Sequence, residues 1–170
     1  MQSVEEYLHA NLVNEWPEGY PLLITNMLRA FALLEITVSD LIAAEYGMEP
    51  LEAATFIGRM ELRLRLEKLS QLYKAREEKD KRDMVELVKK RLRIPIENRN
   101  IVVHNFYLGH VQEGDQTVVV YGSTQVTRTQ DRELQTVRLL NVSDIEQDIE
   151  MYQKTMNLIS AFTPEETEEQ

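Results

Sequence analysis

Three residues late in the chain carry side chains that could bind and cleave a phosphodiester: Arg99, Asn100 and His104. On a helix each residue turns by about 100°, so Asn100 and His104, four positions apart, project from the same face. Arg99 starts on the flank of that face, but its long stem and planar fork of donors can swing towards it. An arginine holds anionic oxygens, and a histidine exchanges protons near neutral pH. The three residues therefore predict an anion site on a late helix.

The segment around these residues resembles the motif of a known family. Residues 99–104 read Arg-Asn-Ile-Val-Val-His, which is similar to the Arg-x4–6-His signature of the HEPN superfamily (higher eukaryotes and prokaryotes nucleotide-binding domains), with a polar residue after the arginine. The resemblance covers residues 21–108 and the last helix. It implies a mainly α-helical bundle of four to five helices. Family members commonly form a homodimer in which two copies of the motif face each other in a cleft.

The resemblance also implies a reaction, because active HEPN proteins resemble metal-independent endoribonucleases. His104 would exchange protons as a ribose 2′-hydroxyl attacks the adjacent phosphate of single-stranded RNA, and the products would end in 2′,3′-cyclic phosphates. Arg99 would stabilise the developing negative charge, Asn100 would orient the phosphate, and Tyr107 would line the cleft. No cofactor is implied. The family further implies a toxin or phage-defence component, with an antitoxin or another regulatory protein as its partner.

Glu35 is a further candidate for the site, because it lies within an otherwise apolar helical stripe. A carboxylate is unusual in such a place, and a buried one needs a cation. We expect Arg99 to be that cation, and the resemblance favours Glu35 because an acidic residue on an early helix recurs in HEPN active sites. The alternative is that Glu35 lies at the edge of the stripe and faces water.

The composition is that of an ordinary globular protein and limits the other chemistries. The 170 residues are 43% hydrophobic and 28% charged, which fits one domain with a real core. The chain has no cysteine, and its three histidines are not spaced as ligands, so no metal site is predicted. No apolar run approaches the roughly 20 residues of a membrane span, and the N-terminus is acidic rather than signal-like. We therefore expect a cytoplasmic protein that does not enter a membrane.

The charge is distributed unevenly along the chain. The net charge is −10, yet residues 59–99 hold 14 basic and 8 acidic residues, which leaves 5 basic and 21 acidic residues elsewhere. A basic surface just before the motif could recruit RNA, while the acidic remainder limits unspecific binding. The alternative is that these charges line solvated helix faces in pairs such as Glu61–Arg65 and Glu86–Lys90.

Hydrophobic periodicity predicts five helices. They span residues 3–14, 21–46, 51–78, 84–108 and a final stretch that starts at a capping box, Ser143 to Glu146. Pro95 lies inside the fourth helix, where we expect a kink or break, and Gly109 ends it.

The period changes to alternation after the fourth helix. Residues 110–140 predict a small antiparallel β-meander of two or three strands, inserted before the last helix. The chain is thus predicted to be a single HEPN-like domain, residues 1–162, followed by an acidic, disordered tail, residues 163–170.

Trp16, the only tryptophan, lies in a loop with two prolines and a glycine. We expect it to anchor that loop by packing, and the alternative is that it stacks on a ligand.

A second interpretation belongs to another functional class. The helical segment ahead of the motif also resembles mannitol-repressor-type and related HEPN-like regulators, which are known for protein interaction rather than for a nuclease motif. Arg99, Asn100 and His104 would then be a structural hydrogen-bond cluster in an adaptor. A third interpretation keeps the same pocket as a nucleotide-binding or RNA-binding module without catalysis. Exposure of His104 in a cleft would favour the nuclease, whereas a buried, fully hydrogen-bonded His104 would suit the adaptor.

Overall fold

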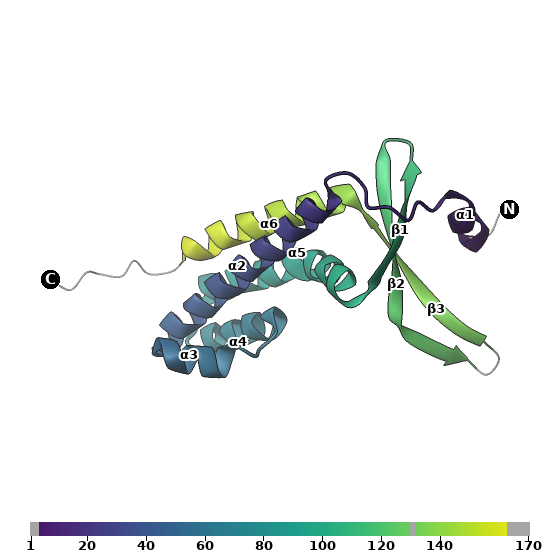
Figure 1. Ribbon diagram of the computed structural model, residues 1–170. Coiled ribbons are helices and arrows are strands. Elements are labelled where there is room, and N and C mark those ends of the chain that lie inside the picture. The colour runs from purple at the N-terminus through teal and green to yellow at the C-terminus, as the bar shows by residue number, and fades with distance from the viewer. Residues whose placement is uncertain (1–3, 130–131, 163–170) are drawn as a thin grey trace. The chain divides into compact units, whose positions relative to one another are not determined.

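The computed structural model describes residues 4–129 and 132–162, which are mainly helical with one small sheet. The chain divides into two compact units, Met1–Leu28 with Ile94–Ile149 and Arg29–Arg93 with Glu150–Gln170. Three long helices each contribute residues to both units. Figure 1 labels the helices and strands. The elements follow in the order α1 (Val4–Asn11), α2 (Tyr20–Tyr46), α3 (Pro50–Ile57), α4 (Leu62–Ala75), α5 (Lys79–His104), β1 (Phe106–Glu113), β2 (Gln116–Thr129), β3 (Arg132–Asn141) and α6 (Val142–Ser160).

The second unit is a helical bundle. It is built from α3, α4 and parts of α2, α5 and α6, and each helix turns an apolar stripe inward. In α4 the stripe is Leu62, Leu66, Leu69 and Tyr73, all buried at steps of three or four residues. Phe31 of α2 meets Tyr152 of α6 edge to face, with ring centroids 5.5 Å apart. The apolar stripes of these helices therefore build the core of the second unit.

One carboxylate joins three elements of the bundle. Glu45, at the end of α2, accepts hydrogen bonds from Arg76 at 2.7 Å, from Lys81 at 2.9 Å and from Tyr73 at 3.0 Å. Burial by itself would raise the pKa of Glu45, but the hydrogen bonds from Lys81 and Tyr73 and the nearby cationic charges outweigh it. The pKa of Glu45 is consequently lowered, and the carboxylate stays charged in the fold.

The first unit is organised around an antiparallel sheet with the strand order β1-β2-β3. Its centre is the apolar run of β2, in which residues 118–121 are all buried. A register shift between Tyr107 and Gly109 bends β1 as it passes the loop before α2. Gly109 has a φ of 155°, and a Cβ there would lie 2.6 Å from the carbonyl oxygen of Val13. Only glycine lets the loop approach this closely, and Val13 pairs with His110 beside it.

The predicted meander is present, but the helix before it is shorter than the sequence indicated. We expected a helix over residues 84–108, whereas α5 ends at His104 and Phe106 already begins β1. Phe106 and Tyr107 pair with Gly122 and Tyr121, because the sheet offers their backbone regular partners that a helix end would lack. Tyr107 therefore lies on a strand and not on the motif helix. Pro95 is buried within α5, which has no break there.

The helix predicted over residues 51–78 is in fact two helices. The N–H of Gly58 bonds to the carbonyl oxygen of Ala54 and closes α3, while Glu61 takes an extended conformation as the N-cap of α4. Phe56 of α3 is 63% exposed. The described residues thus contain six helices rather than four to five.

The helices near the two ends of the chain differ from the predicted bounds by a few residues. Helix α6 begins at Val142, one residue before the expected cap at Ser143. The first helix ends at Asn11 and not at residue 14, and its expected start at residue 3 lies outside the described residues. The predicted acidic tail, residues 163–170, lies outside the described residues.

A candidate anion site at the end of helix α5

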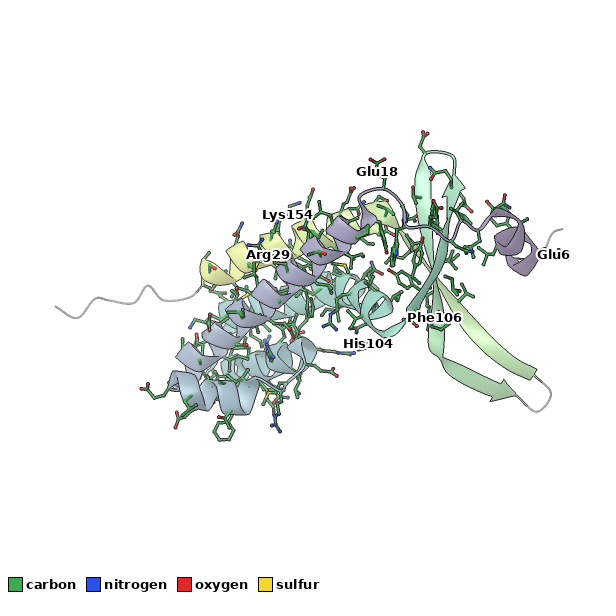
Figure 2. All side chains as sticks on the ribbon, in the orientation of Figure 1. Glu6, Glu18, Arg29, His104, Phe106 and Lys154 are labelled. Carbon is green, nitrogen blue, oxygen red and sulfur yellow. The ribbon has the colours of Figure 1, made fainter. Side chains whose placement is uncertain are left out.

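The last turns of α5 form one side of an open cavity in the first unit, with a volume of about 390 Å³. We call it the His104 cavity, and it is lined by Glu97, Asn100, Ile101, His104, Asn105, Ser123 and Arg138. Figure 2 labels His104 on the final turn of α5, just before Phe106 at the start of β1.

Asn100 and His104 line this cavity together. They are one helical turn apart on α5, and both side chains are exposed. An imidazole that exchanges protons with a substrate must be reachable, so the exposure of His104 suits a chemical role better than a structural one.

Arg99 does not line the cavity but acts on a residue that does. Its Nη1 donates a hydrogen bond to Oδ1 of Asn100 at 3.1 Å. Because the amide oxygen is engaged, the group that Asn100 can still offer is its NH2, a donor for an anionic oxygen. The guanidinium therefore orients Asn100.

The structure adds two residues that the sequence did not indicate, Ser123 and Arg138. They lie 19 and 34 positions after His104, and the sheet brings them back to the end of α5. Arg138 is paired with Tyr121 in the register of β2 and β3, and its side chain is exposed. It supplies a permanent cation to the cavity, while Glu97 supplies the one carboxylate among the lining residues. No local sequence signal marks Arg138, because only strand register places it.

Glu35 belongs to the second unit, whereas Arg99 belongs to the first. The carbonyl oxygen of Glu35 accepts hydrogen bonds from Nη1 of Arg65 at 3.0 Å and from Oγ of Ser39 at 2.7 Å. Arg65 is itself buried, so the backbone of Glu35 helps to hold that guanidinium in the bundle. The expected pairing of Glu35 with Arg99 stays a prediction.

Tyr107, predicted to line the catalytic cleft, lies in a neighbouring aromatic cluster. Its ring stacks on Trp16 with centroids 3.9 Å apart, and its hydroxyl donates to the carbonyl oxygen of Glu15 at 2.6 Å. Burial raises the pKa of Tyr107, and nearby Tyr121 raises it further. Tyr107 lines a second cavity and not the His104 cavity.

A larger cavity of about 640 Å³ lies between α1, the sheet and the start of α6. Its ionisable lining side chains include Glu113 and Asp144, and the buried Oδ1 of Asn141 in its lining has no hydrogen-bond partner. These oxygens are acceptors, and they would repel a phosphate. The His104 cavity is therefore the better anion site despite its smaller volume.

Among the side chains that the structure describes, no group of three or more His, Asp or Glu residues is arranged to hold a metal ion. Every helix described is too short or too polar to cross a lipid bilayer.

No family model, curated protein or solved structure matches the chain.

Proposed function

We propose that the protein is an endoribonuclease that cleaves single-stranded RNA at the His104 cavity without a metal ion. The observation that carries this proposal is that an exposed His104 shares one open cavity with Asn100 and Arg138. A proton carrier, an amide donor and a permanent cation are the groups that a phosphodiester substrate needs. The likeness of residues 99–104 to the HEPN motif supports the same conclusion.

In this mechanism the ribose 2′-oxygen attacks the adjacent phosphorus while His104 accepts the 2′-hydroxyl proton. The bond from phosphorus to the 5′-oxygen breaks, and a 2′,3′-cyclic phosphate forms on one fragment. The 5′-oxygen takes a proton from water and leaves as a hydroxyl group, and His104 then releases its proton to solvent. Arg138 and the NH2 of Asn100 hold the non-bridging oxygens, whose negative charge grows in the transition state.

Arg99 acts in this proposal as a positioning residue. Its hydrogen bond to Asn100 Oδ1 leaves the NH2 group of Asn100 to bind the phosphate. The HEPN resemblance adds a biological setting, a toxin or phage-defence enzyme restrained by a partner protein and acting as a homodimer.

A different observation supports a second candidate, an adaptor that binds a protein partner. Helix α3 exposes two large apolar side chains, Leu51 at 80% and Phe56 at 63%. Exposed apolar side chains on one short helix are typical of protein contacts when they form a patch. In that case RNA would not be cleaved, and Leu51→Glu would abolish binding to the partner.

The deciding experiment incubates purified protein with end-labelled single-stranded RNA in excess EDTA, beside His104→Gln and Arg138→Ala. His104→Gln keeps a polar side chain of similar reach but cannot exchange a proton at neutral pH. We expect cyclic-phosphate products from the unchanged protein, and a loss of about 10²–10⁴-fold in the rate for His104→Gln.

Arg91→Ala is the matched control for charge, because Arg91 is an exposed arginine of the second unit. It should cleave at the normal rate. If the unchanged protein binds RNA but does not cleave it, the protein is an RNA-binding module and not a nuclease. Absence of both cleavage and binding would favour the adaptor.

A further inference from the structure

A second cavity, of about 370 Å³, adjoins the His104 cavity at Asn105. We call it the Trp16 cavity, and its lining is mainly aromatic and aliphatic: Trp16, Pro21, Ile24, Val102, Asn105, Tyr107 and Tyr121. Asn105 is the one residue that lines both cavities. On the last turn of α5, Ile101 lines the first cavity and Val102 lines the second. The two cavities therefore share a wall at Asn105.

The aromatic lining is a stacked platform. Trp16 and Tyr107 stack with ring centroids 3.9 Å apart and an interplanar angle of 16°, and Trp16 and Tyr20 stack at 5.7 Å and 21°. Tyr107 is held in place because its hydroxyl donates to the carbonyl oxygen of Glu15, the residue before Trp16. The platform is thus built before any ligand arrives, which lowers the entropic cost of binding.

Trp16 retains much of its surface even though it is stacked. It is 53% exposed, an unusual fraction for the largest apolar side chain of a small protein. A tryptophan that only anchored its loop would bury most of this surface. An exposed ring on a rigid aromatic neighbour is instead typical of sites on which a nucleobase stacks.

Asn105 gives this cavity a fixed hydrogen-bond acceptor. Its Nδ2 donates to the carbonyl oxygen of Ile101 at 2.9 Å, one turn earlier on α5. The amide is therefore held in one orientation, in which Oδ1 is the acceptor that it offers to a ligand, beside the second N–H of Nδ2. An acceptor selects a base that presents an N–H donor, such as the exocyclic amino group of adenine or cytosine. Uracil carries a carbonyl oxygen, O4, where cytosine carries its amino group, and its base-edge donor is N3–H; an acceptor directed at the position of the amino group therefore disfavours uracil.

We propose that the Trp16 cavity binds the nucleobase next to the phosphate held in the His104 cavity, and that it prefers a base with an exocyclic amino group over uracil. The placement of the phosphate rests on the proposed function, but binding of the base requires no cleavage. Stacking on Trp16 also requires that the RNA be single-stranded, because only an unpaired base can leave its neighbours and stack on a protein ring.

Binding can be followed directly, because Trp16 is the only tryptophan in the chain. The probes are short oligonucleotides with 2′-O-methyl groups, which cannot be cleaved by attack of the 2′-oxygen. We expect an all-adenine oligonucleotide to quench Trp16 fluorescence, and an all-uracil oligonucleotide to need about tenfold higher concentration, the effect of one lost hydrogen bond to a base. Equal quenching by both would overturn the base preference, and no quenching by either would overturn the site.

Variants give a second readout, by anisotropy of a labelled all-adenine oligonucleotide. Trp16→Ala should weaken binding about tenfold, whereas Trp16→Phe should keep most of the affinity, because phenylalanine still offers a ring face. Phe56→Ala is the matched control, since Phe56 is also an exposed aromatic residue but lies in the second unit. Equal effects of Trp16→Ala and Phe56→Ala would contradict the site.

The acceptor is tested with Asn105→Leu and Asn105→Asp. The Asn105→Leu protein should bind adenine and uracil oligonucleotides equally. The Asn105→Asp protein keeps an acceptor and should retain the preference for adenine. The order of preference remains measurable even when overall affinity falls, so a mild loss of stability does not obscure the result. An adenine preference that survives in Asn105→Leu would overturn the role of Asn105.

The two proposals fail in different ways. Quenching with the expected preference but no cleavage of unmodified RNA would leave the base site standing and remove the nuclease. If RNA is cleaved at equal rates after adenine and after uracil, and Trp16 fluorescence is not quenched, the nuclease proposal stands and the base site is overturned.

Discussion

The guanidinium of Arg99 donates a hydrogen bond to Oδ1 of Asn100, the next residue in the chain, at 3.1 Å. Because Asn100 lines the His104 cavity and Arg99 does not, the arginine influences a bound phosphate through the amide. A double-mutant cycle can separate this arrangement from direct contact. We expect Arg99→Ala and Asn100→Ala each to slow cleavage, and the double variant to be no slower than Asn100→Ala alone. If the rate losses of the two single variants multiply in the double variant, as measured in single-turnover cleavage assays, Arg99 touches the substrate directly.

The two charges that line the His104 cavity should act in opposite directions on RNA binding. Removing the carboxylate in Glu97→Gln should tighten binding, because a repulsive charge leaves the cavity. Arg138→Ala should weaken binding and reduce the slope of log affinity against log salt by about one, the value for one lost phosphate contact. Anisotropy titrations at several salt concentrations measure both effects. An unchanged slope in Arg138→Ala would place this arginine outside the interface.

Asp148 should make the stability of the protein depend on pH. The residue is 5% exposed, and burial raises its pKa to about 6, although the hydrogen bond from Asn98 opposes this and the charge of Asp144 adds to it. Because the folded pKa lies above the ordinary value of 3.8, the folded state binds the proton more tightly than the unfolded chain. The contribution of Asp148 is therefore favourable below about pH 4 and is lost as pH rises to about 6, by roughly 2–3 kcal/mol.

The variant Asp148→Asn isolates that contribution, because asparagine can accept the same hydrogen bond from Asn98 without a charge. Urea unfolding at pH 4.5 and pH 7 should show a larger gain in stability from the substitution at pH 7. A gain that is the same at both pH values would contradict the raised pKa.

The buried hydroxyl groups of Tyr20 and Tyr121 lie 2.7 Å apart and form a hydrogen bond between α2 and β2. Tyr20→Phe leaves the Tyr121 hydroxyl buried without this partner, which should cost about 1–3 kcal/mol in the free energy of unfolding. Removing both hydroxyl groups should cost less than the sum of the two single changes, because no polar atom of the pair is then left unmatched. Urea denaturation of the three variants measures this, and strictly additive losses would show that the two hydroxyl groups do not depend on each other.

Breaking the Glu45 cluster should destabilise the helical bundle. Glu45→Ala removes the common acceptor of Tyr73, Arg76 and Lys81. The expected loss is about 1–3 kcal/mol, below the value for a fully buried pair because both cationic partners are partly exposed. The lowered pKa of Glu45 means that the unchanged protein should lose this contribution as acid protonates the carboxylate, so the two proteins should converge in stability at low pH. A constant difference across the acid range would argue against a charged Glu45.

The sequence by itself determined the features that depend on residues close together in the chain. Helix α2 was placed to within one residue, because its apolar positions repeat every three or four residues between a first-turn proline and Gly47. The meander before the last helix followed from the change to alternation. Asn100 and His104 line one cavity because a helix brings residues four apart to the same side.

The tertiary structure decided what depends on distant partners. Pairing with β2 ends α5 at His104 and turns Tyr107 towards Trp16, 91 positions earlier in the chain. The register of β2 and β3 brings Arg138 to the His104 cavity. Strand register depends on which residues of two separate segments exchange backbone hydrogen bonds, and this cannot be read from either segment alone. Residue types and helical spacing therefore singled out Arg99, Asn100 and His104, and only the sheet added Arg138 and the aromatic cavity beside them.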